Sequence, residues 1–140
     1  MGILEVQLSA ARQDLPNLLT RVVRQGSPVR VTRRGGESAV MIADDQLERL
    51  LAGFPFPLPE GTTEPDGSFS YWLPDLELYA NAPTQAEAQA QLTREVLDYS
   101  DDYLTQPSLL YAPNRQHHLP WVLRALLGSS AEKLQRQLFS

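Results

Sequence analysis

The sequence predicts an α+β protein made of two small sheet-containing parts, and three observations carry this prediction. Residues 28–43, PVRVTRRGGESAVMIA, have the pattern of a β-hairpin that follows an amphipathic helix. Residues 69–80 alternate apolar and polar side chains, which is typical of a second pair of strands, and a helical pattern follows. A proline-rich segment separates the two patterns. We therefore expect an N-terminal β-α-β-β-α module, a β-β-α unit and C-terminal helices.

Length and composition favour a globular protein of a reducing compartment. The chain has 140 residues, 42% of them hydrophobic, which suffices for a folded core. It has no cysteine, which excludes a disulfide framework and is compatible with the cytoplasm. No apolar run approaches the roughly 18 residues of a membrane helix. The N-terminus lacks the basic and apolar regions of a signal peptide.

Charge is distributed unevenly along the chain. The net charge is −5, but residues 1–51 carry +1, residues 52–105 carry −9 and residues 106–140 carry +3. Because an acidic protein binds nucleic acid poorly in general, any DNA contact must come from a local basic patch. The acidic middle would suit a basic protein partner, or it serves solubility.

The first elements are a short strand and a helix. Residues 3–8 alternate apolar and polar side chains, and Ser9 is a candidate N-cap. Pro16 lies inside the helical pattern and should bend the helix or mark a restart. Gly26 should end it. The apolar positions recur at spacings of three and four, and they are Leu15, Leu18, Leu19, Val22 and Val23.

The hairpin is the next element, and its turn carries two guanidinium groups. Strand 29–32 should be half-exposed, and residues 39–42 should form a buried return strand. Gly35 and Gly36 supply the positive φ angles of a tight turn. Arg33 and Arg34 then lie at the tip, where forked donors suit phosphate oxygens.

A second helix closes this module. Asp44 and Asp45 should open it, with Leu47, Leu50 and Leu51 on one face. A module of about fifty residues has too small a hydrophobic core to be stable alone, so we expect it to bury apolar surface against a second copy of the chain.

These residues resemble the N-terminal domain of Phd/YefM antitoxins. The resemblance rests on SAARQDL and VRVTRRGGESAVMIADDQLERL and covers residues 3–51. It implies a dimerisation and DNA-binding domain over residues 1–51, which binds operator DNA as a homodimer. Arg12 and Arg33 fall on the family's DNA-contacting arginines, Arg34 lies beside them, and Arg30 is a fourth candidate. Ala43 stands where a helix-capping serine is usual, and Asp44 is expected to take that role.

A linker and a second module follow. Residues 52–66, with four prolines, should form an extended, semi-rigid spacer that packs on its own protein. Strands are expected at 69–73 and 76–80, separated by Pro74-Asp75. Thr84 and Glu87 form a capping box for a helix that ends before Pro107. One face of this helix should carry Ala88, Leu92, Val96, Tyr99 and Tyr103.

The segment DGSFSYWLPDLELYANAPTQAEAQAQLTREVLDY is similar to the core of HicB-type antitoxins. The resemblance implies a small β-β-α unit over residues 67–105, a partial RNase-H-like fold that blocks a toxin without catalysis. The glycine usual after Pro-Asp-Leu is replaced by Glu77. Asp98, Asp101 and Asp102 form an acidic helix end rather than a metal site.

Residues 106–140 should form a helical arm. We expect a helix over 119–127 that ends at Gly128, then a capping box formed by Ser129 and Glu132. This arm either contacts a toxin or packs on its own chain, and a helix-turn-helix is the less favoured third interpretation. His117-His118 lacks the spacing of a metal site. The candidate toxin-binding side chains are Trp121, Leu123, Leu127, Leu134 and Leu138.

The two resemblances together imply a cytoplasmic type II antitoxin that neutralises a cognate protein toxin and represses its own operon as a homodimer or higher even oligomer. No catalytic motif is present, so we expect no enzyme, cofactor or metal. The alternative is a protein-binding immunity or adaptor module without DNA binding, which the net negative charge favours.

Overall fold

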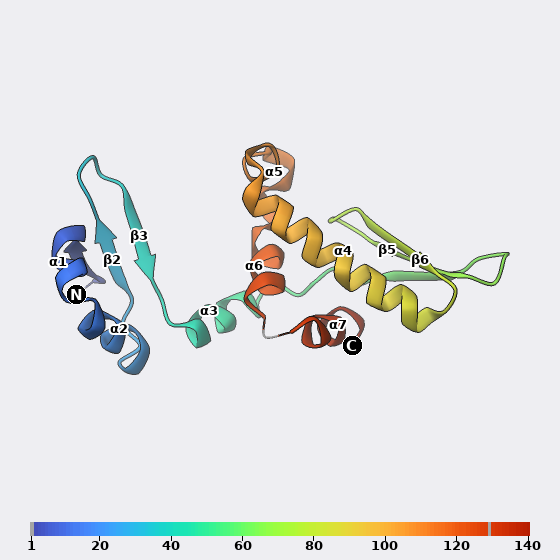
Figure 1. Ribbon diagram of the computed structural model, residues 1–140, viewed down its shortest axis with the longest axis horizontal. Coiled ribbons are helices and arrows are strands. Elements are labelled where there is room, and N and C mark those ends of the chain that lie inside the picture. Colours follow the sequence, from blue (N-terminus) through green and yellow to red (C-terminus); the bar gives the residue numbers. More distant parts are fainter. Residues whose placement is uncertain (1, 129) are drawn as a thin grey trace. The chain divides into compact units, whose positions relative to one another are not determined.

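The computed structural model describes residues 2–128 and 130–140, and the chain divides into two compact units. The N-terminal unit ends at Ala52, and the C-terminal unit begins at Gly53. Each contains one three-stranded sheet, and seven α-helices lie within the described residues (Figure 1). The protein is therefore of mixed α+β class, as the sequence predicts.

The N-terminal unit packs two helices on one face of its sheet. Its strands are β1 (Leu4–Gln7), β2 (Val29–Thr32) and β3 (Ser38–Met41), with β1 parallel and β3 antiparallel to the central β2. Its helices are α1 (Leu8–Gln13), α2 (Leu15–Arg24) and α3 (Asp44–Leu51). The core is small and consists of Ala11, Leu18, Val22, Val29 and Ala43.

The predicted first helix is divided into α1 and α2. Pro16 lies in the first turn of α2, where its missing N–H has no intrahelical partner to lose, so the restart interpretation is confirmed. Gly26, with φ 64°, follows the C-cap residue Gln25, as predicted for a helix end. The prediction of Ser9 as an N-cap is wrong. β1 pairs with β2 as far as Gln7, so α1 begins directly at Leu8 without a side-chain cap.

Three further expectations for this unit are wrong. The return strand β3 was expected to be buried, but Ser38, Ala39 and Val40 are exposed, because β3 lies at the sheet edge. Leu50, expected on the packed face of α3, is 62% exposed. Asp44 is not the N-cap of α3, because Ala43 occupies that position without a side-chain hydrogen bond.

The C-terminal unit places a long helix across a second sheet. Strands β4 (Glu60–Thr63), β5 (Phe69–Leu73) and β6 (Leu78–Ala82) are antiparallel in that order. Helix α4 (Gln85–Thr105) packs on the sheet, and α6 (Leu119–Leu127) and α7 (Ala131–Phe139) pack on α4. Two short pieces connect them, α5 (Pro107–Leu110) and a 3₁₀ segment (Pro113–His118).

The segment predicted as a linker is largely built into this unit. Residues 60–63 form β4, and Phe56 is buried in the core. Main-chain carbonyls of the same segment accept side-chain hydrogen bonds from α6: Trp121 Nε1 donates to Pro55 O at 2.9 Å, and Arg124 Nη1 donates to Phe54 O at 2.8 Å. These contacts confirm that the segment packs on its own protein, whereas the strand over residues 60–63 was not expected.

Capping and turn chemistry explain the element boundaries of the second unit. Thr84 Oγ1 accepts from Glu87 N at 3.2 Å, so the predicted cap of α4 is confirmed. The second strand was expected from Leu76, but β6 begins at Leu78, and Leu76 is buried in the turn. The predicted capping residue Ser129 lies outside the described residues. Ser130 caps α7 by accepting from Lys133 N at 3.1 Å.

Candidate functional site

The tip of the β2–β3 hairpin is held by main-chain hydrogen bonds and two glycines. Arg33 N donates to Glu37 O at 3.0 Å, and Gly36 N donates to Arg33 O at 3.3 Å. Gly35 has φ 91° and Gly36 has φ 85°, which confirms the predicted positive angles. A Cβ at either glycine would meet nothing within 4 Å, so the backbone angle alone demands glycine there.

Three of the four candidate DNA-binding arginines surround one shallow depression. The depression measures about 590 Å³ and lies on the sheet face that the helices leave open. Arg30, Arg33 and Arg34 line it together with Glu5, so its lining carries a net positive charge inside an acidic protein. The remaining lining residues are Gln7, Thr32, Gly36 and Ser38.

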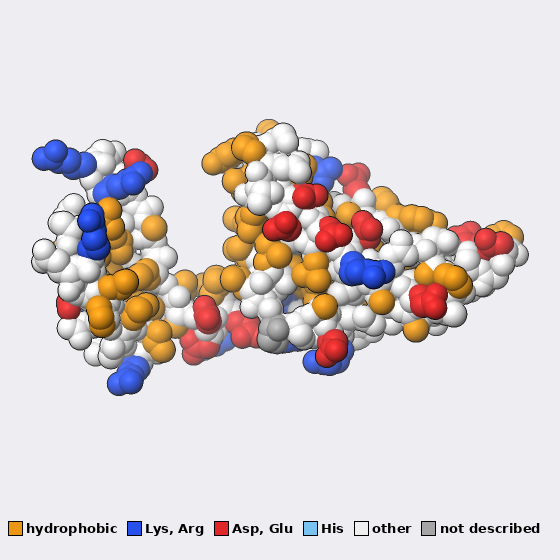
Figure 2. Space-filling model, in the orientation of Figure 1, with side chains coloured by type: hydrophobic (Ala, Val, Ile, Leu, Met, Phe, Trp, Pro, Cys, Tyr) orange, Lys and Arg blue, Asp and Glu red, His pale blue; other side chains and the backbone are white. Residues whose placement is uncertain are grey.

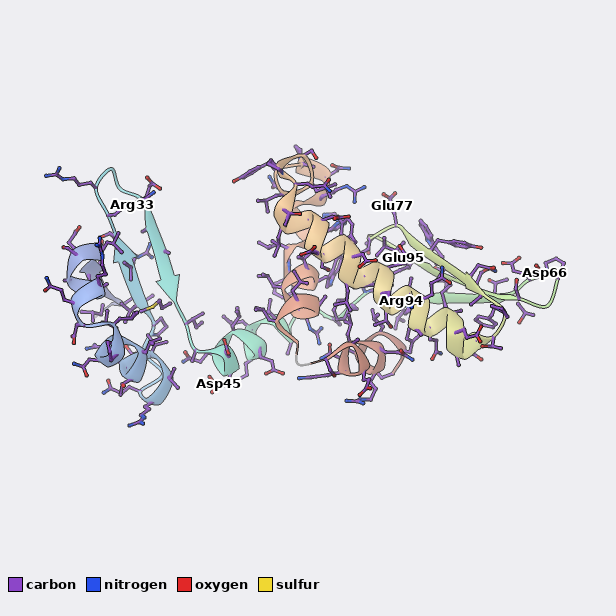
Figure 3. The ribbon with its side chains drawn as sticks, in the orientation of Figure 1. Arg33, Asp45, Asp66, Glu77, Arg94 and Glu95 are labelled. Carbon is purple, nitrogen blue, oxygen red and sulfur yellow. The ribbon has the colours of Figure 1, made fainter. Side chains whose placement is uncertain are left out.

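Two of these arginines already have weak partners. Arg33 Nη2 lies 2.7 Å from Glu37 Oε2, with both side chains more than half exposed at 59% and 69%. An exposed pair of this kind contributes only about 0–1 kcal/mol, so a phosphate can displace Glu37 at small cost. Arg30 Nη1 lies 3.5 Å from Ser38 Oγ, the limit for a hydrogen bond. Arg33 stands at the end of the hairpin in Figure 3.

Arg12 does not belong to this depression. It is exposed in the last turn of α1, a helix that packs against β1 and β2 through Ala11. Figure 2 shows several Lys and Arg side chains at and beside the hairpin end of the N-terminal unit. The structure therefore groups Arg30, Arg33 and Arg34, and it leaves Arg12 as a separate surface cation.

The apolar stripe predicted for α2 is only half buried. Leu18 and Val22 lie in the core at 6% and 2% exposure. Leu15, Leu19 and Val23 are spaced by four residues and are 44%, 47% and 63% exposed. Since residues at i and i+4 share one helix face, these three side chains form a continuous apolar ridge, which we call the α2 ridge.

The candidate toxin-binding side chains of the C-terminal arm lie in different surroundings. Leu134 and Leu138 are 3% and 2% exposed and belong to the unit's own core. Trp121 and Leu123 are half-buried, and Leu127 is 58% exposed. In this conformation a partner can therefore reach Leu127 but not Leu134 or Leu138.

His118, which the sequence analysis considered only as half of a metal-binding pair, is buried in this unit. His118 is 2% exposed, and its Nδ1 lies 2.7 Å from Tyr99 Oη. Arg115 Nη1 donates to the same Tyr99 oxygen at 2.9 Å. Burial, followed by the nearby charges of His117 and Arg115, lowers the pKa of His118. The imidazole is therefore kept neutral.

Some structural features are absent from the described residues. Among residues 2–128 and 130–140, no three His, Asp or Glu side chains are grouped so that they would hold a metal ion. None of the described helices is long and apolar enough to cross a membrane.

The sequence contained signals for part of what was missed. Glu37 follows Arg33 by four residues across a turn, a spacing that brings the two side chains together in a hairpin. Alternation along the strands also assigns Glu5 to the same sheet face as Arg30, since the two are paired in the β1–β2 register. The burial of His118 had no local signal, because helix α4 that covers it comes from elsewhere in the chain.

Comparison with known proteins supports an antitoxin assignment. The family model PHD-like, described as "Antitoxin of toxin-antitoxin, RelE / RelB, TA system", matches residues 1–139. A crystal structure from Syntrophomonas wolfei subsp. wolfei, described as an antitoxin part of a proposed toxin/antitoxin system, has the same fold. It superposes with a TM-score of 0.82 at 23% identity, over 98% of this chain and 97% of that chain. No curated protein matches the chain.

Proposed function

The chain belongs to this PHD-like antitoxin family, and we propose that it both neutralises a cognate protein toxin and represses its own operon. The N-terminal unit would bind operator DNA, in keeping with the Phd/YefM resemblance. The C-terminal unit, with its HicB-like resemblance, would bind the toxin. The observation that carries the DNA-binding proposal is the grouping of Arg30, Arg33 and Arg34 around one open depression.

The geometry of the hairpin favours phosphate as the ligand. Guanidinium groups offer planar, forked donors that match phosphate oxygens. The glycine turn exposes Arg34, and the adjacent depression is open to an extended polyanion. Because the rest of the protein is acidic, this local cluster is where DNA would approach.

A second copy of the chain would complete the N-terminal unit. The α2 ridge exposes Leu15, Leu19 and Val23 to solvent, whereas the core beneath it is small. Burying such a ridge against its own symmetry mate gives a two-fold dimer, since the same surface then serves both subunits. Two hairpins related in this way would contact DNA on successive turns of the duplex.

Light scattering tests the dimer. Leu19→Glu should convert the wild-type dimer to a monomer, because a carboxylate cannot be buried unpaired at the ridge. Leu127→Glu is the matched control at a leucine of the C-terminal unit, 58% exposed against 47% for Leu19, and it should leave the mass unchanged. A wild-type monomer would contradict the dimer.

A mobility shift with the DNA upstream of the gene tests the repressor role. The wild-type chain should retard this DNA more strongly than a scrambled sequence, and Arg33→Ala combined with Arg34→Ala should abolish the shift. Arg49→Ala with Arg24→Ala removes the same charge from exposed helical positions outside the depression and should leave the shift in place. Equal loss in both double variants would indicate a general charge effect and contradict the proposal.

An alternative function is a protein-binding immunity or adaptor module that binds no DNA. Two observations favour it: Arg33 is already paired with Glu37, and Glu5 lies among the arginines of the depression. The same mobility shift separates the two functions. Absence of any shift, with toxin neutralisation retained, would establish the alternative.

A further inference from the structure

The sheet of the C-terminal unit has an outer face that presents two large aromatic side chains to solvent. Tyr71, Leu73 and Ala80 point to the core, so alternation turns Trp72 and Tyr79 to the opposite face. Trp72 and Tyr79 are directly opposite in the β5–β6 register and are 41% and 55% exposed. Exposed Trp and Tyr side chains in one cluster are typical of binding hot spots.

Acidic side chains surround these two rings. Glu60 lies opposite Trp72 in the β4–β5 register, and it is exposed. Asp75 and Glu77 follow at the β5–β6 turn, and both are exposed. Figure 3 shows Glu77 at this turn, pointing away from the sheet. We call the surface formed by Glu60, Trp72, Asp75, Glu77 and Tyr79 the aromatic–acidic face.

The outer face is rigidly built around Tyr79. The hydroxyl groups of Tyr79 and Ser70 share a hydrogen bond of 3.0 Å, and Asn81 Nδ2 donates to Ser70 Oγ at 2.8 Å. Ser70 is only 4% exposed, so these partners fix it beneath the surface. Such a network orders the aromatic ring before any partner arrives, which lowers the entropic cost of binding.

A recess of about 340 Å³ adjoins Trp72. One side is formed by Trp72 and the β5–β6 turn, and the other by the 3₁₀ segment; the lining residues are Trp72, Pro74, Asp75, Glu77, Asn114, Arg115, His117 and His118. Two turn residues, Asp75 and Glu77, have φ of 66° and 56° although neither is glycine. Such angles cost free energy and are concentrated at functional sites.

The floor of the recess contains a buried polar atom without a good partner. Tyr99 Oη accepts from Arg115, so its own proton is available to His118 Nδ1, and the neutral imidazole then carries hydrogen on Nε2. His118 Nε2 is buried against the backbone of Asp75 and makes no hydrogen bond of ordinary geometry within the described chain. This nitrogen therefore belongs to the buried floor of the recess and is not accessible to a ligand.

The charge of this region selects a cation. Three carboxylates, those of Glu60, Asp75 and Glu77, oppose the single guanidinium of Arg115. Arg115 already has two partners, because its Nη2 lies 3.6 Å from Glu77 Oε2 and its Cζ lies 5.6 Å from the centroid of the Tyr99 ring. The surrounding segment, residues 52–105, has ten acidic side chains and one arginine, which would steer a basic partner toward it.

We propose that the aromatic–acidic face docks a segment of a basic protein partner, with an arginine or lysine of that segment held over Trp72 between Asp75 and Glu77. Trp is the best aromatic acceptor for a cation, and the two flanking carboxylates supply the charge-assisted hydrogen bonds. The inference rests on the proposed function in that the basic partner is taken to be the toxin.

A tetra-arginine peptide with blocked termini tests this chemistry without knowledge of the toxin. The readout is the indole N–H signal of Trp72 in a ¹⁵N NMR spectrum of the full chain. Trp121 provides an internal reference, because its indole donates to Pro55 O at 2.9 Å. The Trp72 signal should shift saturably while that of Trp121 stays, and tetra-aspartate should shift neither. A response to tetra-aspartate equal to that to tetra-arginine would overturn the proposal.

Substitutions locate the site. Trp72→Ala should lower the affinity for the tetra-arginine peptide at least tenfold, as measured by tyrosine fluorescence or calorimetry. Asp75→Asn combined with Glu77→Gln should lower it to the same extent while leaving the aromatic rings in place. Asp98→Asn combined with Asp101→Asn removes equal charge from exposed positions of α4 and should bind as the wild type does. Equal weakening in the two charge variants would overturn the site.

Growth rescue in cells that express the adjacent reading frame separates this inference from the proposed function. If the wild-type chain and the Asp75→Asn, Glu77→Gln variant rescue growth equally well, the antitoxin role stands and this docking surface is wrong. If the peptide binds at Trp72 but the wild-type chain rescues nothing, the surface stands and the partner is a different basic protein. Loss of rescue in the variant alone supports both.

Discussion

The salt dependence of DNA binding by Arg34→Ala gives a quantitative prediction. Arg34 is exposed at the turn and has no hydrogen bond within the described chain, so its removal should leave the fold intact. Each phosphate contact contributes about 0.9 to the slope of log affinity against log salt, because bound counterions are released. A two-fold dimer loses two such contacts, so the slope should become shallower by about 1.8.

This change is large enough to measure. Over a fourfold rise in salt, a slope difference of about 1.8 means that the variant loses roughly 12-fold less affinity than the wild type. Fluorescence anisotropy with labelled upstream DNA in a NaCl series gives both slopes. Arg49→Ala, an exposed arginine on α3, should keep the wild-type slope. An Arg34→Ala slope equal to the wild-type slope would refute the phosphate contact.

Three predictions concern the C-terminal unit, each checked by urea unfolding. Leu134→Ala should lower the free energy of unfolding by about 2–5 kcal/mol, because the Leu134 side chain is 3% exposed. Leu127→Ala, at a 58% exposed position, should change it by less than about 0.5 kcal/mol. Equal losses in the two variants would contradict the packing of α7. Gly61→Ala should destabilise the protein by about 1–3 kcal/mol, because the new Cβ would lie 2.9 Å from a ring atom of Tyr71 on β5. An unchanged urea midpoint of unfolding would contradict the packing of β4 against β5. The lowered pKa of His118 means that the unfolded chain binds more protons below about pH 6.5, so stability should fall as pH drops below that value. His118→Gln should flatten this fall and His117→Gln should keep it, and the reverse result would contradict the assignment.

Local chemistry in the sequence predicted the turn and cap positions well. Gly35, Gly36 and Gly26 demand positive φ, and Thr84 supplies an oxygen where the first turn of α4 has free N–H groups. These features depend on a few neighbouring atoms. Turn and cap positions can therefore be predicted from the residue types of a short segment.

Burial was harder to predict, because it depends on packing between distant segments. The stripe on α2 looks uniform in the sequence, yet the structure buries Leu18 and exposes Leu19. The supposed linker is anchored by Trp121, which is 66 residues away from Pro55. Neither outcome follows from periodicity alone.

The candidate sites show the same contrast between features set by local sequence and features set by packing of distant segments. Arg33 and Arg34 were identifiable because a hairpin turn must expose its tip, whereas the separation of Arg12 from them required the layer order of the N-terminal unit. In the second unit Leu134 and Leu138 were candidates for toxin contact, in an arm that was expected either to contact a toxin or to pack on its own chain. In the structure they form core with α4, because α7 folds back onto that helix.

The central claim is that one chain divides two tasks between two compact units, and Arg33→Ala tests it most directly. The same preparation of the full-length variant is measured for its shift of upstream DNA and for rescue of growth against the toxin of the adjacent reading frame. We expect the shift to disappear and the rescue to remain at the wild-type level, since Arg33 lies in the N-terminal unit. Loss of both activities together, in a variant that is still folded, would contradict the division.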